Sequence, residues 1–141
     1  MGLNWTRKRK QTRGMAMVEM VFVLPLLILI VFMIASFGLM FSRWLTLSNA
    51  VREGARTGVA WRGATCATTV PPISQQVKDK VVAYARAGGV PLMTSDVTVT
   101  NACGATGTQL DVSASYNFKL NIPYGNLGSV PIAYKSSMRN E

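Results

Sequence analysis

The chain has few side chains that could do acid–base or metal chemistry. Among its 141 residues there is no histidine, the commonest general base and the commonest metal ligand. Serines are plentiful and carboxylates occur at Asp79, Asp96 and Asp111, but no recognised catalytic spacing joins them. Two thiols do not complete a tetrahedral zinc site. We therefore predict no enzymatic activity, no small-molecule substrate, no metal and no cofactor.

The two cysteines, Cys66 and Cys103, are the remaining reactive pair. Both fall in a region that we expect to lie outside the cytoplasm, where disulfides form and persist. A bridge closing a loop of about 38 residues would stabilise the fold by roughly 3–4 kcal/mol on the chain-entropy model. The sequence therefore predicts a Cys66–Cys103 disulfide, with two free thiols as the alternative.

Charge is segregated along the chain, which has a formal net charge of +9 and a mean hydropathy of +0.23. Five basic residues and no acidic one lie in residues 1–14, and residues 20–42 carry no charge. The uncharged run is long enough for a membrane-spanning helix and too long for the apolar core of a signal peptide. Basic residues stay on the cytoplasmic side. We predict a single-pass protein whose N-terminus is cytoplasmic and whose residues after the span are extracytoplasmic.

Two residues in or beside the apolar run are unusual. Glu19 stands at its head, where a carboxylate complements the positive end of the helix dipole or serves a functional role. Pro25 lies inside the run and removes a backbone donor, so we expect a kink about one turn upstream.

The sequence around Glu19 carries a resemblance to a known family. Residues 13–19 read RGMAMVE, residues 18–27 read VEMVFVLPLL, and residues 50–58 read AVREGARTG. The first resembles the processing site of type IV prepilins, and the other two resemble the core and the "A-x-R-E-G-A-R" segment of the TadE-like family. That family contains pseudopilins of tight-adherence (Flp) pilus systems. Met20 departs from the phenylalanine of many members, but it is also apolar.

The resemblance implies cleavage between Gly14 and Met15 by a prepilin peptidase. Residues 1–14 would then be a disposable cytoplasmic leader, and the mature chain would carry +4. The new α-amine of Met15 would lie four residues before Glu19, on the same helix face. Pairing of these two groups, within a chain or between neighbours, would fix the axial register of assembling subunits.

We expect the N-terminal helix to cover residues 15–60 and so to continue beyond the membrane. Ala50, Gly54 and Gly58 recur every four residues and form a stripe of small side chains that lets another helix or a sheet approach closely. On other faces, Arg43 fits a membrane-interface anchor, and Arg52 and Arg56 form a basic row. The arginines face solvent, lipid phosphate or acidic groups of a partner subunit. No aromatic-interleaved basic patch indicates nucleic acid.

Residues 61–141 are predicted to form a small extracytoplasmic α+β domain. Apolar residues at helical spacing over residues 73–85, with a glycine stop at Gly88-Gly89, predict an amphipathic helix. Strict alternation predicts strands at residues 97–100 and 110–120, and residues 132–138 hint at a third strand. Residues 101–108 and 123–126 are predicted turns. The expected fold is an antiparallel sheet packed on helices.

The function that fits these features is a minor pilin or pseudopilin used in assembling a tight-adherence pilus. Its expected partners are the prepilin peptidase, other pilin or pseudopilin subunits, the pilus assembly platform and membrane lipid. Its expected location is the bacterial inner membrane, with incorporation into an extracellular pilus as a further option. One alternative is an uncleaved, membrane-anchored envelope protein that binds a partner. Another is a minor pseudopilin of a type II secretion or DNA-uptake system.

Overall fold

One long helix carries the apolar run predicted from the sequence. The computed structural model describes residues 9–60, 70–122 and 125–140. Helix α1 covers Arg9–Ala60, helix α2 covers Ile73–Ala87, and a single 3₁₀ turn, η1, covers Thr94–Asp96. The strands are β1 (Val97–Thr100), β2 (Gln109–Ile122) and β3 (Gly125–Arg139). The chain divides into two compact units, Met1–Gly38 and Leu39–Glu141, and α1 runs through both.

The first unit consists of the N-terminal part of α1. From Gly14 onward, α1 is the one helix in the described ranges that is long and apolar enough to cross a membrane, which makes it compatible with a single-pass anchor. The helix begins at Arg9, whereas we expected it to begin at residue 15. Gly14 costs a helix only about 1 kcal/mol, and residues 9–13 contain neither proline nor a second glycine to end it. The helix also continues through Pro25.

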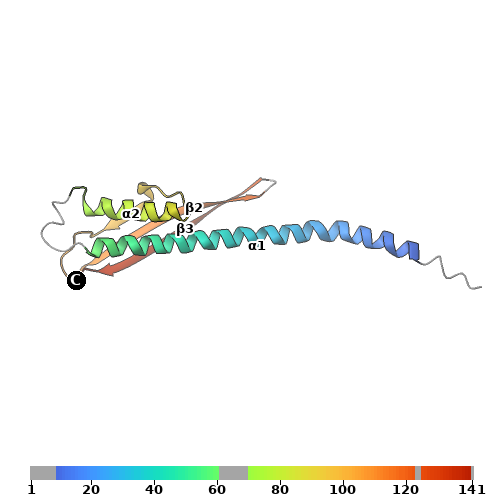
Figure 1. Cartoon of the computed structure of the whole chain (residues 1–141), viewed down its shortest axis with the longest axis horizontal. Helices are drawn as coiled ribbons and strands as arrows, with labels where there is room; N and C mark the ends of the chain where they lie inside the picture. The colour runs from blue at the N-terminus through green and yellow to red at the C-terminus, as the bar shows by residue number, and fades with distance from the viewer. Residues whose placement is uncertain (1–8, 61–69, 123–124, 141) are drawn as a thin grey trace, which may run out of the picture. The chain divides into compact units, whose positions relative to one another are not determined.

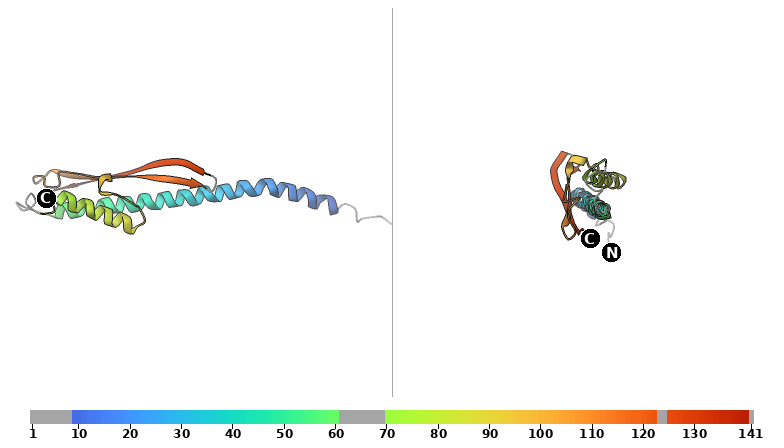
Figure 2. Two further views of the ribbon diagram at one scale, coloured as in Figure 1. Left: turned by 90° about the horizontal axis from the view of Figure 1, so that it is seen from above. Right: turned by 90° about the vertical axis from the view of Figure 1, so that its left-hand side faces the viewer.

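The second unit is an α+β fold, as predicted. Its three strands form an antiparallel sheet in the order β1-β2-β3, with β2 in the centre. The last part of α1 and the whole of α2 cover one face of this sheet, as Figures 1 and 2 show. The other face carries the polar half of the alternating β2 pattern, so one side of the sheet is buried and one is open to water.

Side chains from every layer of the second unit meet in one apolar core. α1 contributes Leu47 and Val51, α2 contributes Val77 and Val81, and β2 contributes Leu110, all fully or almost fully buried. The strand register places Val112, Ala114 and Ile132 on the same face of the sheet. Because helices and strands all share this core, the unit has a hydrophobic centre of its own.

The predicted elements agree with the structure except at some of their ends. The helix of residues 73–85 is α2, which buries Ile73, Val77, Val81 and Ala85 and stops at Gly88. Strands β1 and β2 lie where alternation predicts them, and β2 is slightly longer. The hint of a third strand covered only residues 132–138, but β3 already begins at Gly125, within the predicted turn. The rest of that turn, residues 123 and 124, lies outside the described residues.

Candidate functional site

The head of α1 holds the three residues singled out for processing and register. Gly14, Met15 and Glu19 all lie in the helix and are exposed. A Cβ atom added to Gly14 would meet nothing within 4 Å, so the backbone here is open to an approaching protein. Met15 and Glu19 are one helical turn apart on one face. The backbone at Gly14 is helical, so a peptidase that binds extended chains must unwind this turn.

The apolar residues that follow are exposed all around the helix. Large side chains at consecutive positions from Met20 to Leu24 are each about half or more exposed, and the pattern continues to Phe41. A helix that is apolar on every side and not buried in its own protein is typical of a membrane span. This arrangement fits lipid or the helices of other subunits as its surroundings.

The stripe of small residues lies inside the second unit. Ala50, Gly54 and Gly58 are buried. A Cβ atom added to Gly54 would collide with Cγ2 of Val81 on α2, and one added to Gly58 would lie 2.6 Å from Cδ2 of Leu110 on β2. The stripe therefore faces both the neighbouring helix and the central strand of its own unit.

Two of the three arginines lie against aromatic side chains of the sheet. Arg43 donates from Nη1 to the Tyr116 hydroxyl at 3.1 Å, and its guanidinium carbon lies 5.0 Å from the centre of the Phe118 ring. Arg52 donates from Nε to the Tyr134 hydroxyl at 2.9 Å and lies 5.5 Å from that ring's centre. Cation–π contact and the hydrogen bond together hold each guanidinium in place. The sequence did not predict these partners. The alternation of β2 and β3 indicates that the tyrosines face the helix, but it does not indicate which helical residue each one meets.

The third arginine differs from the other two. Arg56 is exposed and makes no hydrogen bond or ion pair with any residue in the described ranges. It therefore remains available to solvent, lipid or a partner, and a partner contact for all three arginines stays a prediction.

One family match covers Gly14, Met15 and Glu19 and two of the three stripe residues, Ala50 and Gly54. Residues 14–56 match the family model described as TadE-like protein. This segment is TadE-like. The match confirms, over this segment, the resemblance noted in the sequence. The family is not known as enzymatic. Comparison with the curated proteins and with the solved structures finds no match.

Beyond the TadE-like segment, the carboxylates considered as catalytic groups take part in local contacts. Asp79 accepts a hydrogen bond from Gln75 at 3.0 Å, and Asp96 accepts one from the Met93 amide at 3.0 Å. Across residues 9–60, 70–122 and 125–140, no group of three metal-ligating side chains comes together. These contacts cap or support helices and give the carboxylates a structural role.

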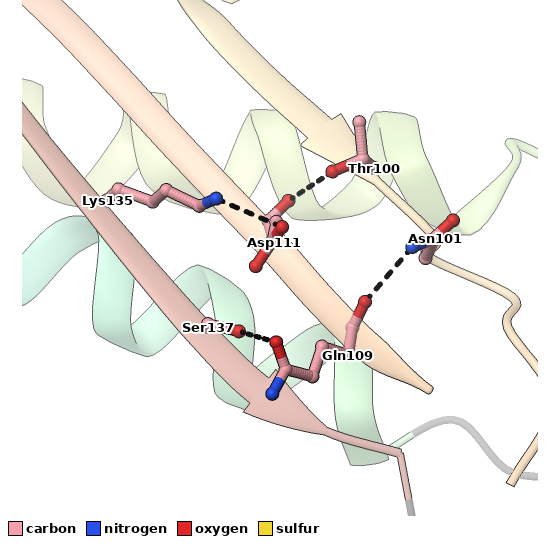
Figure 3. A network of polar contacts seen from close by, with 6 residues as sticks. All are labelled: Thr100, Asn101, Gln109, Asp111, Lys135 and Ser137. Carbon is pink, nitrogen blue, oxygen red and sulfur yellow. Dashed lines mark hydrogen bonds and ion pairs between the residues drawn. The ribbon is translucent and has the colours of Figure 1, made fainter. Parts of the chain in front are cut away.

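Asp111 belongs to a polar network on the open face of the sheet, shown in Figure 3. Its Oδ2 lies 3.1 Å from Nζ of Lys135. The Ser137 hydroxyl donates to Oε1 of Gln109 at 3.2 Å in the rotamer drawn. Ser137 also lies directly across the strands from Asp111, and the nearby Ser137 hydroxyl, followed by the Lys135 ammonium, lowers the pKa of Asp111.

We expect this network to make a small acid-dependent contribution to stability. A carboxyl whose pKa is lower in the folded chain stabilises it above the unfolded-state pKa, and that stabilisation is lost as the pH falls through the folded-state pKa. The variant Asp111→Asn should therefore lose some thermal stability at pH 7 and little in acid. Melting curves across pH 2–7 test this, with Ser137→Ala expected to give a weaker form of the same change. Identical pH profiles for wild type and D111N would contradict it.

The predicted disulfide remains a prediction. Cys66 lies outside the described residues. Cys103 follows β1, in the connection to β2, and the described part of the chain contains no free cysteine. Pairing of Cys66 with Cys103 would tie the segment after the TadE-like helix to the edge of the sheet.

Proposed function

We propose that the chain is a minor pilin or pseudopilin subunit of a Tad pilus, processed by a prepilin peptidase after Gly14. One observation carries the proposal: a TadE-like match over residues 14–56 that begins at the glycine of the processing motif. The helix after this glycine is apolar and exposed, and its far end enters a unit with its own core. A major pilin of this kind consists of little more than the apolar helix. The large second unit, called the outer unit from here on, therefore favours a minor subunit.

Cleavage would convert the chain from an anchored precursor into a subunit that can assemble. It removes five positive charges that hold the N-terminus in the cytoplasm, and takes the formal charge from +9 to +4. The exposed helix of residues 20–41 could then exchange lipid for the helices of neighbouring subunits. Pseudopilins, the assembly platform and lipid are the partners that this step requires. The inner membrane is the proposed location, with the outer unit on its extracytoplasmic side.

N-terminal sequencing tests the proposal. The full chain is purified from cells with the prepilin peptidase and from cells without it. We expect a mature chain beginning at Met15 in the first case and an intact leader in the second. An intact leader on the functional protein in both would contradict the proposal and leave the uncleaved envelope protein as the better interpretation.

Glu19 has a specific place in this proposal. After cleavage its carboxylate lies one helical turn from the Met15 α-amine, and an unpaired charge among packed apolar helices is costly. The variant Glu19→Ala should therefore be cleaved normally but recovered with pili at least tenfold less often, a loss of about 1.4 kcal/mol in pairing. Immunoblots of sheared pili and membranes provide the measurement.

The control for Glu19→Ala is Glu53→Ala, in the same helix but within the outer unit. Glu53→Ala should leave recovery with pili close to wild type. Normal recovery of the Glu19 variant would rule out the register role without affecting the cleavage proposal.

A further inference from the structure

Strand β3 is an outer strand of the sheet over its whole length. It pairs with β2 on one side, and no strand of the described residues pairs with it on the other side. The strand belongs entirely to the outer unit. An outer strand carries unpaired backbone N–H and C=O groups, which are a template for a strand of another chain.

The hydrogen bonds on either side of β2 indicate which backbone groups of β3 are unpaired. The Gln109 carbonyl accepts from the Asn101 side chain at 3.2 Å on the β1 side, and the Asn140 amide donates to the Thr108 carbonyl at 2.8 Å on the β3 side. Successive residues of a strand direct their backbone groups to opposite sides. With the observed register, the even-numbered residues of β3 therefore face β2. The residues that face away from β2 are Ala133, Lys135, Ser137 and Arg139.

Two features that often block an edge strand leave this stretch open. Pro131 also faces outward and has no N–H, so strand pairing at this edge would end there. Lys135 forms an ion pair with Asp111 at 3.1 Å on the open face of the sheet, so its ammonium is directed back over β2, as Figure 3 shows. Every outward-facing residue from Ala133 to Arg139 is exposed.

Beside this edge, the helix-covered face of the sheet is only partly covered. We call this surface the β3 ledge, and it is formed by Trp44, Arg52, Tyr134, Ser136 and Met138. The three residues from β3 are half-buried, Trp44 is 38% exposed, and Arg52 is exposed. The Trp44 and Tyr134 rings meet edge to face with their centres 6.2 Å apart. A strand added to β3 would place every second side chain against this ledge.

The Arg52 guanidinium is oriented on the ledge with donors to spare. Its Nε donates to the Tyr134 hydroxyl, and its two terminal nitrogens make no hydrogen bond or ion pair with a residue in the described ranges. A guanidinium presents a planar fork of donors that matches both oxygens of a carboxylate. Arg52 can therefore bind a carboxylate without losing the contact that orients it.

The charges around the ledge favour an acidic partner. Residues 112–140 contain basic residues and no acidic residue, and Arg56 lies one turn beyond Arg52. The acidic residues of the outer unit lie elsewhere: Glu53 lines a groove with Asp79 of α2, Asp96 precedes β1, Asp111 is paired on the open face, and Glu141 lies outside the described residues. A second copy of β3 would bring only basic residues to the ledge, so a different protein fits better.

We propose that the β3 edge binds an extended, acidic segment of another protein as an additional strand of the sheet. The outward backbone groups of residues 133–139 supply the main-chain hydrogen bonds, and Arg52 binds a carboxylate of the added strand. Trp44 and Met138 contact its apolar side chains. Main-chain bonds give such complexes affinity, and the side-chain contacts give them specificity. The interaction goes beyond the proposed function, because it requires neither cleavage nor incorporation into a pilus.

Amide hydrogen exchange on the full chain in detergent micelles, resolved by residue with NMR, tests this proposal. The probe is a peptide of alternating threonine and valine around one central glutamate, at millimolar concentration. We expect the amides of Ala133, Lys135 and Ser137 to exchange about tenfold more slowly with the peptide. The amides of Tyr134 and Ser136 already face β2, so their exchange should change little. This alternation is specific to an added strand.

A second peptide, with glutamine in place of the glutamate, tests the charge. The glutamate peptide should bind the wild type about tenfold more tightly, as a charge-assisted hydrogen bond predicts. Arg52→Gln should reduce this preference to less than about twofold. Arg43→Gln is the matched control, because Arg43 has similar contacts with Tyr116 and Phe118 of the central strand, and it should keep the preference. The preference compares two peptides on one protein, so a less stable variant still gives a valid result.

Three results would overturn the proposal. Unchanged exchange with the glutamate peptide would mean that the edge accepts no strand. Equal binding of the two peptides would mean that the partner is not recognised by its charge. Protection that rises with protein concentration in the absence of peptide would indicate a second copy at this edge.

Discussion

Replacing Gly14 by valine is expected to leave the leader on nearly all of the protein, against almost complete removal in the wild type. Gly14 is exposed on the helix and has no Cβ atom. A peptidase can therefore reach and unwind the backbone there without meeting a side chain. A β-branched side chain would restrict the backbone and obstruct the cleavage site. Intact mass of the membrane-extracted protein measures the change, and pilus recovery of the subunit should fall in parallel.

The control for this prediction is Gly38→Val. Gly38 is also a helical glycine in α1, and a Cβ added there would likewise meet nothing within 4 Å. Loss of a helical glycine is thus matched, and only the position differs. Cleavage of the Gly14 variant at the wild-type rate, or an equal defect in the Gly38 variant, would show that the predicted cleavage site is wrong.

The residues at the head of α1 could be identified from the sequence because their relationship is local. Gly14, Met15 and Glu19 lie within two helical turns, and their spacing alone puts the last two on one face. The helical state of Gly14 could not be foreseen. The processing motif indicates where a peptidase could cut. It does not indicate that the helix of the apolar run extends back through Gly14.

The contacts of Arg43 and Arg52 are beyond such local reasoning. Their tyrosine partners are 73 and 82 residues away in the chain. To predict these contacts, one must know which turn of α1 lies beside which residues of β2 and β3. That alignment depends on how the whole core packs. Periodicity shows which face of a strand is buried, but it does not show which helical turn that face meets.

Strand β2 could be predicted from its own sequence pattern, but the first half of β3 could not. Alternating apolar and polar residues identify β2, because a sheet with one wet face imposes that period. The first half of β3 has glycines at 125 and 128 and a proline at 131 instead, and it becomes a strand through its register with β2. The pairing partner, and not its own composition, makes this segment extended.

The stripe of small residues was predicted to admit a helix or a sheet, and the structure has both. Gly54 lies against α2 and Gly58 against β2, so α1 is in close contact with two layers of the core. Close-packed interiors do not absorb added volume easily. Gly54 is therefore the position where a larger side chain should be most damaging.

Replacing Gly54 by valine is expected to destabilise the outer unit by about 3 kcal/mol, at the upper end of the usual cost of overpacking. The first added carbon would collide with Val81, and the backbone oxygen of Val77 lies 3.5 Å from the same position, which leaves little room for α2 to shift. The gain in helix propensity over glycine is below about 1 kcal/mol and cannot compensate. Urea unfolding of the full chain in detergent, followed by near-ultraviolet circular dichroism, measures the loss.

Two further variants separate overpacking from a general effect of mutating the helix. Asn49→Val places the same side chain on the exposed face of α1, where asparagine and valine have similar helix propensity, so stability should change by less than about 0.5 kcal/mol. The loss of stability in Gly54→Ala should be between the losses in this control and in G54V. Alanine adds only the first of the colliding carbons, and it has the highest helix propensity. Equal stability of the Gly54 and Asn49 valine variants would mean that α1 and α2 are not in close contact at Gly54.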